Sequence, residues 1–292
     1  MESRATRSRH LRATAWWFTL PGLLFQFFFG WFPVLIAFLV GFQRYYFAKS
    51  PEYVGFDNFR AVVSDPLTLE VFKNTFYFAA LSLSLTFIIP IFVSILLMEM
   101  RQRTIRWMMV LWFIPVASTA GIVIWKYLYN PRLGLLNGIL SALHLPTQKW
   151  LDDPNLAMIS LVLPGLILFG PGLMYIAALQ SIPNELYEAA EIEGARFFQK
   201  IRYVTLPRLR PIIAMMLIFS VIGSMQVFEL PFIMTSGGPG YATTTVVQQV
   251  YSLAFNAFNL GKATALAIVL FFVIMTIIII QRRVYRENVD VS

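Results

Sequence analysis

The chain alternates between long apolar stretches and short polar ones. An α-helix needs about 20 consecutive apolar residues to cross the hydrocarbon layer of a membrane. The runs here are continuously apolar and lack the period-two alternation of membrane β-strands. Six stretches have the required length, namely residues 16–40, 76–98, 107–127, 156–179, 212–234 and 263–280. The pattern therefore predicts an all-α integral membrane protein with six transmembrane helices.

Composition agrees with a surface covered by lipid. Of the 292 residues, 58% are hydrophobic and 13% are charged, whereas a soluble domain carries roughly 25% charged residues. The net charge of +8 is attributed to basic residues that flank membrane helices. The sequence lacks a basic stripe with interleaved aromatic residues. We therefore expect the lipid bilayer as the environment and no nucleic acid as a partner.

Lysine and arginine are unevenly distributed among the polar segments. The two tails and the second and fourth loops hold 15 of them in about 65 residues, and the other three loops hold 8 in about 90. Because basic residues favour the cytoplasmic side, both termini are predicted to be cytoplasmic. The first apolar run exceeds the apolar core of a cleaved signal peptide, so it is predicted to be a retained helix.

This topology divides the chain into three parts. Residues 1–70 hold the N-terminal cytoplasmic tail, the first helix and an extracytoplasmic loop. Residues 71–283 hold the other five helices, and residues 284–292 form the cytoplasmic C-terminal tail. Within the second part, the loop of residues 181–210 is the longest on the cytoplasmic side and is unusually polar.

The first half of this loop has the pattern of an amphipathic helix. Asn184 is a candidate N-cap, Glu188 lies where the helix dipole favours anions, and Gly194 ends the helix. Pro207 and Pro211 are expected to fix the return into the bilayer. A solvated surface helix explains this pattern as well as a docking helix does. In a docking helix, small residues allow close approach and glutamates set the register on a partner.

The spacing in the loop resembles the EAA loop of ABC importer permeases. The family pattern is Glu-Ala-Ala, three residues, Gly, nine residues, Ile, one residue and Leu-Pro. This chain has Val204 in place of the Ile, and Glu193 in place of the Asp that usually precedes the glycine. By this resemblance, the residues that couple the permease to its ATPase are Glu188, Ala189, Ala190, Glu193, Gly194, Ala195, Leu206 and Pro207.

The resemblance extends along most of the chain. It implies the type I ABC importer permease fold and indicates the first-permease branch of carbohydrate importers, which includes the maltose and glycerol-phosphate permeases. The other matching segments are Val-Gly-Phe-Asp-Asn-Phe at 54–59, Asn-Thr at 74–75, residues 125–137, Gln-Val-Phe-Glu at 226–229, and Thr-Ser-Gly-Gly-Pro at 235–239 with Thr243.

The resemblance also implies partners and a location. They are a second homologous permease, two ATPase subunits docking on the EAA loop, an extracytoplasmic substrate-binding protein and a sugar, in a prokaryotic cytoplasmic membrane. The sequence lacks the G-x-x-x-x-G-K-[ST] loop that cradles phosphates. ATP and magnesium are therefore expected on the ATPase subunits, with this chain as a cofactor-free, non-catalytic subunit. ATP binding would drive alternating access through the EAA helix.

Polar residues in the spans are candidates for the substrate pathway. Glu229 is the exceptional carboxylate within a span, and an ionisable group there is a functional hypothesis by default. Gln226 lies one turn away, and Phe228 offers a ring on which a sugar can stack. An interfacial Glu229 that only fixes helix packing is an equal alternative. Asn74 is a further candidate.

The span interiors lack basic residues, which favours a neutral sugar over glycerol phosphate. The identity of the sugar stays open. The loop at residues 237–240 is rich in glycine and is expected to be flexible. It is interpreted either as a contact for the binding protein or as a plain turn.

Three other classes of protein remain as alternatives. A secondary transporter would need buried charges or an inverted repeat. A membrane enzyme would need a constellation of reactive side chains; His10 and His144 stand apart in the sequence, and the chain has no cysteine. A membrane scaffold would have no ATPase partner.

Overall fold

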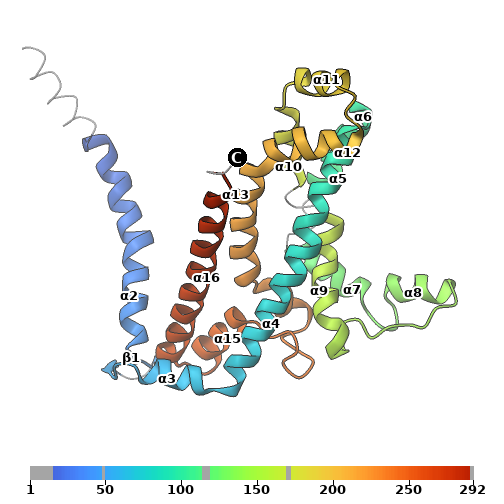
Figure 1. The fold of residues 1–292 in the computed structure, drawn as a ribbon. Coiled ribbons are helices and arrows are strands. Elements are labelled where there is room, and N and C mark those ends of the chain that lie inside the picture. Colours follow the sequence, from blue (N-terminus) through green and yellow to red (C-terminus); the bar gives the residue numbers. More distant parts are fainter. Residues whose placement is uncertain (1–15, 48–49, 114–118, 169–171, 290–292) are drawn as a thin grey trace, which may run out of the picture. The chain divides into compact units, whose positions relative to one another are not determined.

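The computed structural model describes residues 16–47, 50–113, 119–168 and 172–289 (Figure 1). The chain divides into two compact units, which are described separately. One comprises Met1–Ser64 and Val250–Val269, and the other comprises Asp65–Gln249 and Leu270–Ser292. The predicted three-part division follows expected membrane topology instead of internal contacts, and it stays a prediction.

The first unit is built on a long apolar helix, Trp16–Gly41, which contains the π-helical turn η1 (Phe27–Trp31) and α2 (Phe32–Gly41). After it come a two-stranded antiparallel ribbon, β1 (Gln43–Arg44) with β2 (Glu52–Tyr53), and α3 (Asp57–Ser64). The Asn58 amide nitrogen donates to the carbonyl oxygens of Gly41 at 3.0 Å and Gln43 at 2.8 Å. These bonds fix the turn at the end of the helix, and the ribbon is a small exception to the all-α prediction.

All regular elements in the described part of the second unit are helices. Its elements in chain order are α4 (Pro66–Ser82), η2 (Leu83–Ile88), α5 (Ile89–Met98), α6 (Gln102–Phe113), α7 (Thr119–Leu128), α8 (Leu135–Ala142), α9 (Pro154–Leu168), α10 (Gly172–Gln180), α11 (Asn184–Ile192), α12 (Phe197–Lys200), η3 (Ile201–Thr205), α13 (Leu206–Met225) and α14 (Glu229–Met234). The chain then continues through α15 (Val246–Tyr251), η4 (Ser252–Asn256) and α16 (Leu260–Val289), which belong partly or wholly to the first unit.

Four helices among the described residues are long and apolar enough to cross a membrane. They are Trp16–Gly41, Pro66–Met98, Phe197–Met234 and Leu260–Tyr285, and they match the first, second, fifth and sixth predicted spans. The third and fourth predicted spans include residues 114–118 and 169–171, which lie outside the described part of the chain. The membrane-protein prediction is therefore confirmed, and the number of six crossings stays a prediction.

Three of the prolines inside the long helices follow π-helical turns. The turns η1, η2 and η3 each end two residues before a proline, at Pro33, Pro90 and Pro207 respectively. Proline has no N–H, and its ring clashes with the carbonyl four residues earlier. A turn widened to the i→i+5 pattern relieves that clash locally. The helices therefore pass these prolines without a break.

A buried apolar cluster of the second unit positions the polar loop described next. It consists of Phe87, Ile91, Ile95, Tyr175, Leu179, Ile182 and Leu209. Six of these residues lie on η2, α5, α10 and α13, and the seventh, Ile182, lies between α10 and α11. Leu186 and Tyr187 of α11 pack against the cluster. Burial of this apolar surface holds the inner face of α11 against the ends of the membrane helices.

Candidate functional site: the coupling loop and the broken fifth span

The helix predicted in the first half of the 181–210 loop is present as α11 (Asn184–Ile192). Pro183 occupies the N-cap position with an extended backbone, φ −59° and ψ 134°, so Asn184 is the first helical residue. The prediction that Asn184 caps the helix is therefore wrong. Glu185 lies in the first turn, where the helix dipole favours a negative charge.

The C-terminus of α11 is closed by a Schellman motif. The N–H of Ala195 donates to the carbonyl of Ala190, and the N–H of Gly194 donates to the carbonyl of Glu191, both at 2.9 Å. Gly194 has a φ of +79°, the left-handed conformation that favours glycine. The predicted role of Gly194 as the end of the helix is confirmed.

The motif residues of α11 face largely outward. Glu188, Ala189, Glu193 and Gly194 are exposed, as is Pro207 further along the chain, and the remaining motif residues are Ala190, Ala195 and Leu206, all half-buried. Among the described residues, no atom lies within 4 Å of the position that a Cβ on Gly194 would occupy. This end of the helix is therefore open to close approach by another surface.

The second half of the loop is part of the fifth-span helix. The elements α12, η3 and α13 follow one another without interruption from Phe197 to Met225. Pro207 therefore lies within a continuous helix, near the start of α13, and does not mark a loop end. Four residues, Glu193 to Arg196, separate α11 from this long helix (Figure 1).

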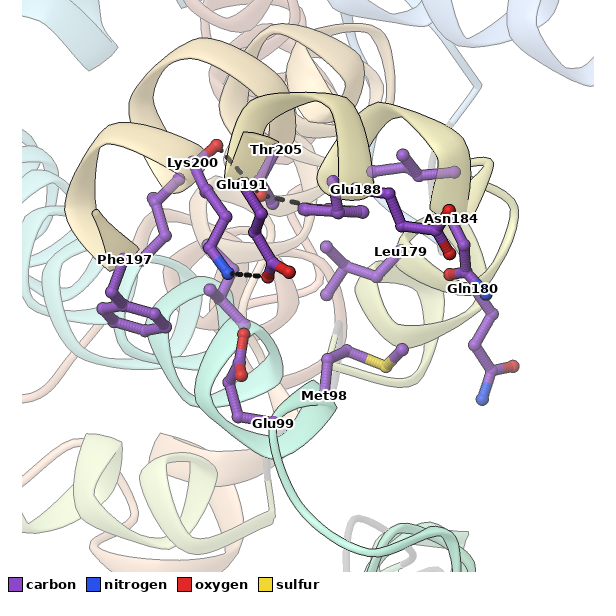
Figure 2. Close-up of a pocket in the computed structure, with 14 residues that line it drawn as sticks. Met98, Glu99, Leu179, Gln180, Asn184, Glu188, Glu191, Phe197, Lys200 and Thr205 are labelled. Carbon is purple, nitrogen blue, oxygen red and sulfur yellow. Dashed lines mark hydrogen bonds and ion pairs between the residues drawn. The ribbon is translucent and has the colours of Figure 1, made fainter. Parts of the chain in front are cut away.

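Two polar contacts connect α11 to the long helix. The Lys200 ammonium donates to the Glu191 carboxylate, with Nζ to Oε1 at 2.7 Å (Figure 2). The hydroxyl oxygens of Tyr187 and Thr205 are hydrogen-bonded at 3.1 Å, and Thr205 is buried. Sequence reasoning missed these four residues because pairs nine and eighteen positions apart meet only once the chain reverses direction at Gly194.

A cavity of about 530 Å³ lies beneath α11. Figure 2 shows Met98 and Glu99, at and just after the end of α5, on one side and Glu188 and Glu191 on the other. Lys200 is the cation among the lining residues. The lining of this cavity therefore carries three carboxylates and one ammonium group.

Large apolar side chains are exposed on the same segment. Ile192 is 88% exposed, Phe198 79% and Tyr203 70%. Ile192 is the last residue of α11, and Phe198 and Tyr203 lie on α12 and η3, near the start of the long helix. Sequence reasoning passed over them because isolated apolar residues in a polar loop carry no periodic signal.

The fifth predicted span is interrupted near its far end. The α13 helix ends at Met225 and α14 begins at Glu229, with Gln226 to Phe228 between them. The fifth predicted span, residues 212–234, therefore consists of two helical segments. The hydroxyl of Thr245 donates to the carbonyl of Val227 at 2.8 Å. It satisfies a backbone group that the break frees, as membrane interiors require.

Three of the four candidate pathway residues lie in or directly beside this break. Gln226 and Glu229 are exposed, and Phe228 is half-buried, with its ring stacked on that of Phe232 at a centroid distance of 4.9 Å. The break interrupts the helix on which Gln226 was expected to lie one turn from Glu229. An amide, a carboxylate and an aromatic pair together suit a hydrogen-bonding, partly apolar ligand.

The fourth candidate, Asn74, is buried and committed to backbone groups. Its amide nitrogen donates to the carbonyl oxygens of Tyr241 at 2.7 Å and Thr244 at 3.1 Å. Asn74 thereby holds the loop that follows α14.

That loop is extensively hydrogen-bonded, contrary to the flexibility expected from its glycines. The hydroxyl oxygens of Thr235 and Thr243 are 2.6 Å apart, and the Thr244 hydroxyl donates to the carbonyl of Gly237 at 2.9 Å. Gly237 has a φ of +87°, and a Cβ on it would lie 2.5 Å from Thr244 Oγ1. The glycine thus permits tight packing, and the threonines stabilise the loop.

Comparisons with known proteins agree with these features. Residues 76–287 match the family model described as "binding-protein-dependent transport system inner membrane component". The trehalose/maltose transport system permease protein of Thermococcus litoralis is 33% identical and covers 88% of each chain. The sulfoquinovosyl glycerol transport system permease protein of Agrobacterium fabrum is 31% identical and covers 81% of this chain and 78% of its own.

A solved structure with a similar fold comes from a bacterial ABC transporter that imports the acidic polysaccharide alginate. One of its chains superposes with a TM-score of 0.82 at 24% identity and covers 97% of this chain and 99% of its own.

Proposed function

This chain belongs to the family of binding-protein-dependent transport system inner membrane components, and we infer from this that it is the permease subunit of an ABC importer for a sugar or oligosaccharide. It is a multi-pass inner-membrane protein and a transport component without catalytic chemistry of its own. Relatives named for trehalose/maltose and for arabinooligosaccharides support carbohydrate as the substrate class.

The proposal includes the subunits that this chain needs. A second homologous permease completes the pathway, and two ATPase subunits carry ATP and magnesium. A substrate-binding protein delivers the sugar at the outer side, and both termini of this chain face the cytoplasm. The exposed face of α11 and the exposed Ile192 and Phe198 support a protein partner at the inner side.

The mechanism that we propose is alternating access driven through α11. Closure of the ATPase subunits on ATP moves α11, and the motion reaches the fifth span because only four residues separate the end of α11 from the start of that helix. The single observation that carries this proposal is the outward-facing Glu188–Gly194 surface joined so closely to a membrane helix.

The proposed sugar contacts are Gln226, Phe228 and Glu229 at the break in the fifth span. Phe228 and its neighbour Phe232 offer an aromatic face, and the two polar side chains offer hydrogen bonds. The partner permease is proposed to line the opposite side of the pathway.

Reconstitution tests the proposed function. The chain is co-expressed with its partner permease, ATPase and binding protein, and the assembly is placed in vesicles. We expect uptake of the sugar carried by the binding protein only when ATP is supplied on the ATPase side. Uptake that follows a proton gradient without nucleotide would instead identify a secondary transporter.

A further inference from the structure

A short joint connects the docking helix to the fifth span, and it has the properties of a hinge. It consists of the four residues Glu193 to Arg196, between the end of α11 and the start of α12. A hinge that bends freely would absorb the motion of α11 instead of passing it on. Something must therefore hold the two helices at a fixed angle if α11 is to act as a lever.

The two contacts across this joint are placed to do so. Tyr187 and Glu191 lie one helical turn apart on α11, and each contacts the long helix, at 3.1 Å and 2.7 Å respectively. The Lys200 side chain is only 19% exposed, and Thr205 is 3% exposed. Both contacts are therefore at least partly shielded from water on the side of the long helix.

The π-helical turn η3 brings the two partner residues onto one face. Lys200 and Thr205 are five residues apart, a spacing that an ordinary α-helix places on different faces. In a turn of the i→i+5 type they lie above one another. The Thr205 hydroxyl lies 3.5 Å from the carbonyl oxygen of Lys200, as this geometry requires. Pro207, two residues beyond η3, thus acts on the joint through the helix geometry.

We propose that Tyr187, Glu191, Lys200 and Thr205 form a two-point brace that locks α11 to the fifth span, with Lys200 as its principal positioning residue. Surface ion pairs contribute little to stability, so the brace serves geometry more than folding. This inference rests on the proposed function, because α11 transmits motion only if an ATPase subunit moves it. The four side chains of the brace hold the docking helix in place and do not themselves contact ATP or sugar.

Charge variants of the brace test the proposal in the reconstituted full assembly. Lys200→Gln and Glu191→Gln are expected to lower the number of sugars imported per ATP hydrolysed by about fivefold or more, since coupling free energies span that range. The double reversal Glu191→Lys with Lys200→Glu restores the contact and is expected to recover the ratio. Arg60→Gln, which breaks the exposed Arg60–Asp57 pair of 3.8 Å on α3, is the matched control.

The possible results distinguish a failure of the proposed brace from a failure of the proposed transport function. ATP-driven uptake with a parental ratio in Lys200→Gln overturns the brace and leaves the importer intact. A double reversal as poorly coupled as the single variants also overturns it. Uptake that needs no ATP in the parent overturns the proposed function itself.

Cross-linking tests whether the joint stays closed during transport. The sequence has no cysteine, so Glu191→Cys with Lys200→Cys can be bridged by a short, reducible bis-thiosulfonate reagent. We expect the cross-link to restore the coupling that the two substitutions remove. Cross-linked assemblies that stop importing, and resume when the reagent is reduced, would show that the joint must open and would overturn the proposal. The cysteine-free parent, treated identically, controls for reaction with other subunits.

Discussion

At the scale of single residues, Gly194 has two properties that bear on α11 as a proposed docking helix. Its left-handed backbone ends α11, and the space around it is empty among the described residues. Because the backbone already explains a glycine, the empty space is an independent observation. The open space leaves room for a partner surface to approach the backbone at this point.

The two properties are separated by substitution of Gly194. Asparagine and aspartate both adopt the left-handed conformation more readily than other non-glycine residues, so each adds a side chain at this open point while α11 still ends there. We expect Gly194→Asp and Gly194→Asn both to insert normally and to lose uptake together with copurification of the ATPase. Gly138→Asp, at a similarly open glycine of α8, is the control. Normal coupling in Gly194→Asp would mean that α11 is not the docking surface.

Asn74 is expected to act on stability more than on substrate binding. Its removal in Asn74→Ala leaves the carbonyls of Tyr241 and Thr244 without their donor. A lost buried hydrogen bond that leaves a partner unsatisfied costs about 1–3 kcal/mol. Thermal unfolding in detergent should therefore occur at a lower temperature than in the parent. Asn256→Ala, at an exposed asparagine, should unfold as the parent does.

At the scale of elements, the fifth span consists of two helices, α13 and α14, and the candidate ligand residues lie at the break between them. We expect Phe228→Leu to raise the KM of uptake by roughly twofold to twelvefold, the value of one aromatic contact of about 0.5–1.5 kcal/mol. Basal ATP hydrolysis should not change. Phe219→Leu, at a 61% exposed ring of α13, is the matched control. Equal effects of the two substitutions would remove Phe228 from the pathway.

Hydropathy predicted the apolar parts of the helices and missed where the helices themselves begin and break. The first span was expected at residues 16–40 and is Trp16–Gly41, because lipid exposure and helix length coincide there. The long helix from Phe197 carries Lys200 and Arg202 before it becomes apolar. Hydropathy reports the edge of the lipid and not the start of a helix, so this extension read as a loop.

The candidate site was predictable to the extent that it depends on local sequence. The glycine that ends α11 and the acidic first turn follow from capping rules. The break at residues 226–228 does not, because Val227 and Phe228 are apolar and the hydroxyl that satisfies the freed carbonyl comes from Thr245, 18 residues later. The two-point brace likewise depends on a chain reversal.

At the scale of the whole molecule, the orientation in the membrane is a prediction from charge alone. The cysteine-free chain allows it to be mapped with single cysteines. An impermeant maleimide added outside should label Ser64→Cys and Ser141→Cys in intact cells, whereas Ser181→Cys should react only after permeabilisation. All three positions are exposed. Labelling of Ser181→Cys from outside would invert the topology and remove α11 from the cytoplasm.

Both ends of α11 are closed by backbone geometry, through Pro183 at one end and the Schellman turn at Gly194 at the other. The outward side chains of this nine-residue segment can therefore be replaced without disturbing the flanking membrane helices. Under the proposed function, substitutions confined to this outward surface are expected to change which ATPase subunits the permease accepts.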